Sequence, residues 1–306
     1  MPPLSEPAAA LILAEGKREK QGDRIKGRVD KKADSGIFCD PEGCFERSGQ
    51  GKTKMARIID LSVAVSLKGN LKVMPQIIYR RHEETPGFFG EAVGLRPEDF
   101  PGGKYCAAEV VSLGTHNTTH LDAPYHFHPT SEGKPAKTID QVPLEWCYGE
   151  GVVLDFHHKK KGEGISAREV QEALRKIGYT LKPWDIVLIR TDVSKRYHEP
   201  GYEYLHPGMT REATRWLTEQ GIKVMGTDAW GWDRPFDTMV ADFKAGKKEQ
   251  LWESHYFGKE KEYCHLERLA NLDRIPRPFG FKVAAFPIKI EAASAGWVRA
   301  VAILED

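Results

Sequence analysis

One short segment, residues 116–128, constrains this chain more than any other. The protein has 306 residues and eleven histidines. A window of thirteen residues should therefore hold about half a histidine, yet this one holds four, together with an aspartate. All five fall on even positions, at His116, His120, Asp122, His126 and His128. In extended backbone such side chains point to one side, and Pro124 must interrupt the strand, so we predict a strand that ends and turns around one cavity.

These residue types suit a divalent metal ion. Such an ion needs several lone-pair donors converging within about 2.0–2.2 Å, and imidazole with carboxylate is a good set for zinc or manganese. The alternative is a run of histidines that are satisfied by hydrogen bonds and take no part in chemistry. A lone histidine would favour that alternative, whereas the spacing H-x3-H-x-D-x3-H favours a metal site.

The segment resembles the signature of the metal-dependent cyclase family, H-x-G-T-H-x-D-x-P-x-H, a family that includes bacterial kynurenine formamidases and isatin hydrolases. The matching residues are His116, Thr119, His120, Asp122, Pro124 and His126. Thr118 stands where the family usually has glycine, which permits backbone conformations that threonine resists. The likeness covers about residues 57 to 304, from Asp60-Leu61-Ser62 to the C-terminal blocks at 285–289 and 298–301.

The resemblance also implies the rest of the metal site. In the family a later histidine and a glutamate twelve residues on complete it, and His255 and Glu267 have this separation, followed by Asn271-Leu272-Asp273. The implied ligands are His116, His120, Asp122, His255 and Glu267. They would hold one or two divalent ions, with zinc favoured over manganese. Asp122 and Glu267 would be able to bridge two ions.

The remaining histidines are expected to have other roles. The resemblance implies that His126 is the acid/base residue. We expect its pKa to be that of an unperturbed imidazole, about 6.5. His265 has no partner by spacing, so we expect it to be structural.

The resemblance implies an α/β chain with a swivelling β/β/α fold, in which a barrel-like mixed sheet is flanked by helices. The residue pattern is also that of a mixed α/β chain. Apolar and β-branched runs predict strands at 57–65, 107–113, 152–155, 186–190, 224–226, 281–290 and 299–304. Capping residues predict helices at 166–177 and 210–220. Residues 74–101, rich in breakers, are predicted to form a long loop.

Composition divides the chain in two. Residues 17–32 carry eight basic and three acidic groups, so we expect residues 1–55 to be an N-terminal extension, partly ordered at best and dispensable for chemistry. A solvated tail is favoured there over a basic arm for nucleic acid or a clasp between subunits. Residues 56–306 are expected to form a single domain.

Bulk properties exclude several classes of protein. The net charge of +1 gives no overall attraction to nucleic acid or to an anionic membrane. No apolar run approaches the roughly 20 residues that span a bilayer. Five scattered cysteines argue for a reducing compartment, so we expect a cytoplasmic protein.

The expected function is metal-dependent hydrolysis of an amide C–N bond, in an aryl formamide or a cyclic amide such as isatin, with an activated water and His126 as proton relay. The alternatives are a metal-dependent cyclase or dehydratase, a lactone hydrolase, and, less favoured, a metal-binding module without turnover. The expected partner is a small-molecule substrate, and the expected assembly is a homodimer or homotetramer. Trp230 and Trp232 either wall the substrate pocket or pack on the core.

Overall fold

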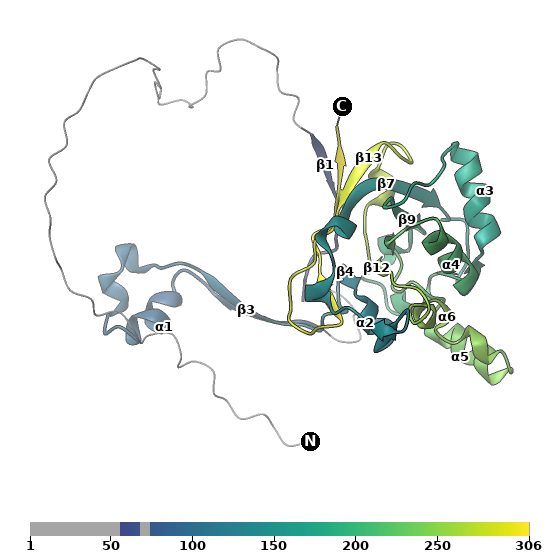
Figure 1. Ribbon diagram of the computed structural model, residues 1–306. Helices are drawn as coiled ribbons and strands as arrows, with labels where there is room; N and C mark the ends of the chain where they lie inside the picture. Colours follow the sequence, from purple (N-terminus) through teal and green to yellow (C-terminus); the bar gives the residue numbers. More distant parts are fainter. Residues whose placement is uncertain (1–55, 68–73, 306) are drawn as a thin grey trace, which may run out of the picture. The chain divides into compact units, whose positions relative to one another are not determined.

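The computed structural model describes residues 56–67 and 74–305. Within these ranges, nine strands form one mixed sheet in the order β1-β15-β13-β7-β9-β11-β12-β4-β14. Their bounds are β1 Arg57–Asp60, β4 His120–Asp122, β7 Tyr148–Asp155, β9 Ile186–Arg190, β11 Val224–Thr227, β12 Cys264–Glu267, β13 Phe281–Ala284, β14 Ala295–Trp297 and β15 Val301–Leu304. The sheet curls into a half-barrel (Figure 1).

Four parallel strands, β7, β9, β11 and β12, occupy the centre of the sheet. Parallel neighbours need a crossover, usually a helix. The crossovers here carry α3 (Ala167–Ile177), α4 (Arg211–Glu219), α5 (Phe236–Lys244) and α6 (Glu253–Phe257). The α3 helix begins at a capping box between Ser166 and Glu169 and ends at Gly178, which has a φ of 69°. Figure 1 shows α3, α4 and α6 on one side of the sheet.

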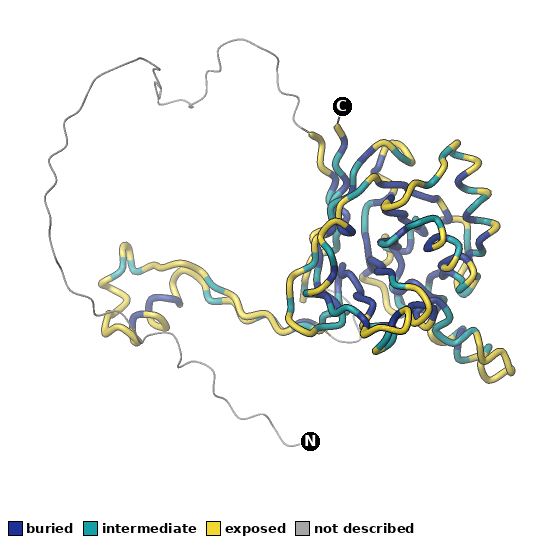
Figure 2. Tube along the Cα trace, viewed as in Figure 1, coloured by how far each residue is buried: buried dark blue, intermediate teal, exposed yellow. Residues whose placement is uncertain are grey.

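Alternate residues of the central strands enter two apolar cores. In β7, Leu154 packs with Val170 of α3 and Leu217 of α4, whereas Val153 points to the opposite core with Leu61. Because both faces are buried, these strands are apolar at successive positions instead of alternating with polar residues. Figure 2 shows the central strands as the most deeply buried part of the described chain.

A separate antiparallel hairpin pairs β2 (Gln76–Arg80) with β3 (Ala108–Ser112), and α1 (Thr85–Glu91) lies between the two strands in sequence. The paired residues Ile78 and Val110 are each 56% exposed, and Figure 2 shows the hairpin as largely exposed. The predicted long loop at 74–101 is therefore wrong in part, because it contains β2 and α1. The shorter elements are α2 Pro124–Phe127, β5 Thr130–Ser131, β6 Lys134–Pro135, β8 Gly164–Ile165 and β10 Gly208–Met209.

The α/β fold expected from the resemblance, a swivelling arrangement with a barrel-like mixed sheet and flanking helices, is confirmed. The predicted helices at 166–177 and 210–220 are α3 and α4, and the strand at 186–190 is β9. The predicted strands at 57–65 and 281–290 are shorter, ending at Asp60 and Ala284. The extension at 1–55 lies outside the described residues, so its boundary stays a prediction. No helix among the described residues is long and apolar enough to cross a membrane.

Candidate metal centre

Two neighbouring strands bring four polar side chains to one face of the sheet. β4 and β12 are antiparallel, in a register that pairs Asp122 with His265 and His120 with Glu267. Directly opposed residues of two strands point to the same face, so the four side chains meet. All four are buried, with at most 6% of the residue exposed.

The chain on either side of β4 adds two histidines. Nδ1 of His116 lies 2.7 Å from Oδ1 of Asp122. Beyond β4, Pro124 begins the short helix α2, which turns His126 back to the cluster. The His126 and His116 rings lie 4.0 Å apart between centroids, and Nε2 of His126 is 3.8 Å from Oδ2 of Asp122. The predicted strand that ends and turns at Pro124 is confirmed.

The α6 helix contributes His255. The carboxylate of Asp233 accepts hydrogen bonds from the backbone N–H groups of Ser254, at 2.8 Å, and His255, at 3.1 Å. The same carboxylate is paired with Nδ1 of His255, which leaves Nε2 as the nitrogen free to act as a ligand.

Two buried lone-pair atoms that lack well-formed hydrogen bonds mark the place where a cation could bind. Nδ1 of His120 donates to the carbonyl oxygen of Thr118 at 2.9 Å, so Nε2 carries the lone pair of the neutral ring. This Nε2 and Oδ1 of Asp122 are 3.2 Å apart and buried, and among the described residues neither has a hydrogen bond of good geometry, although Nδ1 of His116 lies 2.7 Å from the same Oδ1. Buried polar atoms are normally satisfied, and a metal ion would satisfy both.

The donors form two groups that share one carboxylate. His116, His120 and Asp122 form the first, and Asp122, His255, His265 and Glu267 form the second; within each group the donor atoms lie within 4.8 Å of one another. Because Asp122 belongs to both, the donor set fits one ion or two ions bridged by this carboxylate.

The charges of the cluster favour a cation. Burial raises the pKa of Asp122, but the surrounding histidines lower it well below its usual value. Burial and the charge of Asp122 raise the pKa of Glu267, but the hydrogen bond with His265 and nearby imidazoles lower it to about 2. Two buried carboxylates therefore stay ionised at neutral pH.

The environment of His126 differs from our expectation. Burial, opposed by the charge of Asp122, lowers the pKa of His126 to about 4, so the expected unperturbed value is wrong. Its imidazole is neutral at neutral pH and able to accept a proton.

His265 is the residue that the sequence analysis missed. Its Nε2 lies 3.0 Å from Oδ2 of Asp122 and 3.3 Å from Oε1 of Glu267. Burial lowers the pKa of His265, but hydrogen bonds with these two carboxylates raise it to about 9. Its even spacing from Glu267 within a strand was the available signal, since residues two apart share a face. All five ligands implied by the resemblance and His126 also come together here.

The cluster opens into a cavity of about 460 Å³. Its lining is Gly114, Thr115, His116, Asn117, His126, Trp230, Trp252, His255, Glu267 and Arg268. Trp230 is part of this wall, whereas Trp232 is 1% exposed and donates through Nε1 to the hydroxyl of Thr214 at 3.0 Å. Of the two interpretations of these tryptophans, the pocket wall holds for Trp230 and core packing for Trp232.

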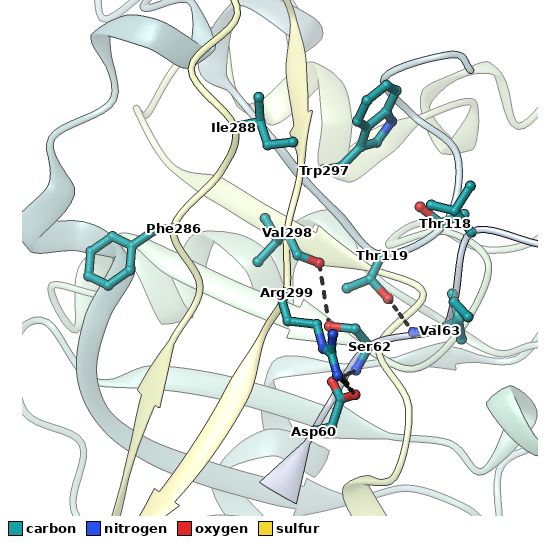
Figure 3. A pocket seen from close by; sticks show the side chains of 12 residues that line it. Asp60, Ser62, Val63, Thr118, Thr119, Phe286, Ile288, Trp297, Val298 and Arg299 are labelled. Carbon is teal, nitrogen blue, oxygen red and sulfur yellow. Dashed lines mark hydrogen bonds and ion pairs between the residues drawn. The ribbon is translucent and has the colours of Figure 1, made fainter. Parts of the chain in front are cut away.

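A second hollow, of about 600 Å³, is shown in Figure 3. In it Arg299 is paired with Asp60 at 2.8 Å, and the backbone N–H of Val63 donates to the hydroxyl of Thr119 at 2.9 Å. Neither group of candidate metal donors found in the described chain includes a residue of this hollow. The first cavity is therefore the candidate reaction site.

Fold and site together define a mixed α/β protein with a candidate metal centre beside a substrate-sized cavity. The model of the Cyclase family, described as "Putative cyclase", matches residues 59–234, more than half of the chain. The chain belongs to this family. The matched range includes the 116–128 segment but ends before His255 and Glu267.

Individual relatives agree with this assignment. The chain is 24% identical to an isatin hydrolase of Roseibium aggregatum over 66% of this chain and 76% of that protein. It is 28% identical to a kynurenine formamidase of Erythrobacter litoralis over 62% and 74%. Among solved structures, isatin hydrolase A of Ralstonia solanacearum superposes with a TM-score of 0.66 at 23% identity, covering 82% of this chain and 92% of that one.

Proposed function

We propose that this chain is a metal-dependent hydrolase that cleaves the C–N bond of an aryl formamide or of a cyclic amide such as isatin. The observation that carries the proposal is the convergence of the implied ligands and His126 on one cavity. The relatives named isatin hydrolase and kynurenine formamidase support this class of substrate.

The proposed ligands are His116, His120, Asp122, His255 and Glu267, holding one or two ions of zinc or, as second choice, manganese. A bound ion of this kind polarises an amide carbonyl and lowers the pKa of a water molecule toward about 7. The chain's own contribution is to hold its donors in place through the Thr118 carbonyl and the Asp233 carboxylate.

His126 supplies the proton transfer. Its neutral imidazole accepts a proton as the water oxygen bonds to the carbonyl carbon, and it returns that proton to the nitrogen as the C–N bond breaks. The products are a carboxylic acid and an amine, which stay joined in one molecule when the amide is cyclic. Trp230 and Trp252 wall the cavity with aromatic surface that suits the aryl group.

The test combines elemental analysis of the purified protein with turnover assays on N-formylkynurenine, isatin, and simple cyclic amides and lactones. We expect bound zinc or manganese and turnover of an aryl formamide or cyclic amide. Turnover of lactones or hydroxy acids without amides would assign the chain to the alternative cyclase, dehydratase or lactone hydrolase chemistry. Bound metal with no turnover of any of them would make it a binding module.

We further propose that the chain forms a homodimer or homotetramer, acts on a small molecule and is cytoplasmic. An isolated two-stranded hairpin is marginally stable in water, and β2–β3 exposes Ile78, Tyr79, Val110 and Val111, which supports burial against another subunit. Cys106, Cys147 and Cys264 are free, as in proteins of reducing compartments. Light scattering of the intact chain and of Ile78→Asp tests the assembly, and fractionation of the source cells tests the compartment.

A further inference from the structure

Arg268 is a buried cation that has no acidic partner in the described part of the chain. The residue is 5% exposed, and among the described residues no carboxylate forms an ion pair with it. The hydrogen bonds of its guanidinium within residues 56–67 and 74–305 go to neutral acceptors at the cavity wall, the carbonyl oxygen of Trp230 and the side chain of Asn117, each at 3.3 Å. A guanidinium has five N–H donors, and buried charges are normally paired. Arg268 therefore has unused donors and an uncompensated charge.

The backbone is held in an unfavourable conformation that brings this side chain to the cavity. Successive residues of a strand point to opposite faces, so Arg268 would be expected to point away from the cavity that Glu267 lines. It lies in the left-handed region instead, with a φ of 57°, and both side chains line the same cavity. Hydrogen bonds hold the backbone of Arg268 on both sides of its Cα. The N–H of Arg268 donates to the carbonyl of Ala229 at 2.9 Å, and its carbonyl accepts from the Thr119 hydroxyl at 2.6 Å. Such strain concentrates at functional positions.

An aromatic surface lies beside the charge. The guanidinium carbon is 4.9 Å from the ring centroid of Trp230, which lines the cavity with Trp252. A cavity of this kind presents a flat apolar wall and a fork of N–H donors, which matches an aromatic ring bearing a carboxylate.

We propose that Arg268 is a carboxylate-binding residue and that the substrate is an anionic aryl amide, whose ring lies against Trp230 while its carboxylate pairs with the guanidinium. This inference rests on the proposed function for the amide, but not for the anion. It makes Arg268 a specificity-determining residue, acting on the part of the substrate that does not react.

The test compares two aryl formamides that differ in charge, 2-formamidobenzoate and formanilide, in the metal-loaded wild-type enzyme and in Arg268→Met. Loss of a charged hydrogen-bonding partner should lower kcat/KM for the anionic substrate by about 10–100-fold, mainly through KM, and leave the neutral one within about threefold. Binding of 2-aminobenzoate, measured by calorimetry, should weaken by a similar factor. Arg299→Met is the matched control, since Arg299 lines the other hollow and its loss should change neither ratio.

The outcomes separate this proposal from the proposed function. Equal losses for both substrates, or unchanged 2-aminobenzoate binding in Arg268→Met, would overturn the carboxylate site. Binding of 2-aminobenzoate that depends on Arg268, without turnover of either formamide, would support the carboxylate site while refuting amide hydrolysis. If Arg268→Met does not fold, Arg268→Lys replaces it; this variant keeps the charge without the fork, and a loss of about 3–10-fold confined to the anionic substrate is expected.

Discussion

The carbonyl oxygen of Thr118 accepts a hydrogen bond from Nδ1 of His120 at 2.9 Å, and it does so from a backbone with a φ of 56°. This conformation is uncommon for a β-branched residue. Thr118 stands at the position where the family signature usually has glycine. The threonine therefore keeps a backbone conformation that glycine adopts easily. The strained peptide fixes the tautomer of a proposed ligand, and such strain costs about 1–3 kcal/mol.

Thr118→Gly should therefore stabilise the fold. We expect the free energy of unfolding to rise by about 1 kcal/mol, because relief of strain exceeds the larger backbone entropy that glycine loses on folding. Urea unfolding of the metal-free protein measures this difference. Thr118→Ala, which keeps a Cβ, should gain less. A loss of stability in the glycine variant would show that the side chain, 2% exposed, contributes more by packing than it costs in strain.

Deleting a proposed ligand from the 116–128 segment should abolish metal binding. His120→Ala and Asp122→Ala are each expected to lose it by elemental analysis, because each deletes a proposed ligand. Glu267→Gln keeps the shape without the charge and should bind more weakly but measurably. The control is His128→Ala: His128 has the same parity, but its Nδ1 lies 3.0 Å from the carbonyl oxygen of Thr130. Full metal content in His120→Ala would refute the ligand assignment.

His265→Ala tests the residue that the structure adds to the cluster. Partners that orient metal ligands typically contribute about 10–100-fold in affinity, and we expect a loss of that size because Asp122 and Glu267 both lose a hydrogen bond. Competition with a chelator measures it. His206→Ala is a fitting control, since this buried histidine belongs to neither donor group. The same affinity in both variants would restrict His265 to packing.

The part of the site that sequence reasoning could predict is the part that is local. The even spacing of His116, His120 and Asp122 is visible within a few residues. Pro124 predicts the turn that brings His126 back to the cluster. His255 and Glu267 came only through the family resemblance, because their position depends on which strand pairs with β4 and in which register. That pairing joins segments more than 140 residues apart and is set by packing, which a periodicity does not encode.

Strand ends were predicted poorly for specific reasons. The apolar run at 281–290 contains Pro287, which cannot donate to a ladder, and the strand ends at Ala284. The run at 57–65 ends at Asp60, and the N–H of Val63 is satisfied by the Thr119 side chain instead of a neighbouring strand. The β2 strand was overlooked because Pro and Gly residues follow it closely. Composition over the whole segment therefore suggested a loop.

The capping box of α3 predicts that part of the free energy of unfolding is lost at acid pH. Burial raises the pKa of Glu169, but its ion pair with Lys159 at 2.8 Å and hydrogen bonds from Ser166 lower it to about 2. Because the pKa of Glu169 in the folded state lies below its ordinary value of 4.5, this stabilisation is present above about pH 4.5 and is lost as pH falls through about 2.

Glu169→Gln keeps an oxygen that can accept the Ser166 hydrogen bond but loses the charge, so it should cost about 0.5–1 kcal/mol at pH 7, the usual worth of a partly exposed ion pair and of a carboxylate in the first turn of a helix. The difference from wild type should shrink below pH 4.5 and vanish below about pH 2, where the carboxyl group is protonated in the folded state too. Denaturant unfolding across this range measures it. Glu172→Gln removes an exposed carboxylate from the same helix and should cost less than about 0.5 kcal/mol. A pH-independent difference for Glu169→Gln would place its effect in packing.

His126→Ala should separate catalysis from metal binding. The ring lies beyond Pro124 and approaches Asp122 only to 3.8 Å, and His126 belongs to neither donor group, so we expect the variant to keep its metal and its fold. Turnover should fall by about 10²–10⁴-fold, the usual contribution of an acid/base residue. In the wild-type enzyme the basic form is present above the folded pKa and is lost as pH falls through it, so the acid limb should lie well below 6.5, toward 4. The variant should lack that limb, and added imidazole should restore part of the turnover. Loss of the metal together with activity would make His126 a ligand, and the proton relay would then have to come from another group at the cavity.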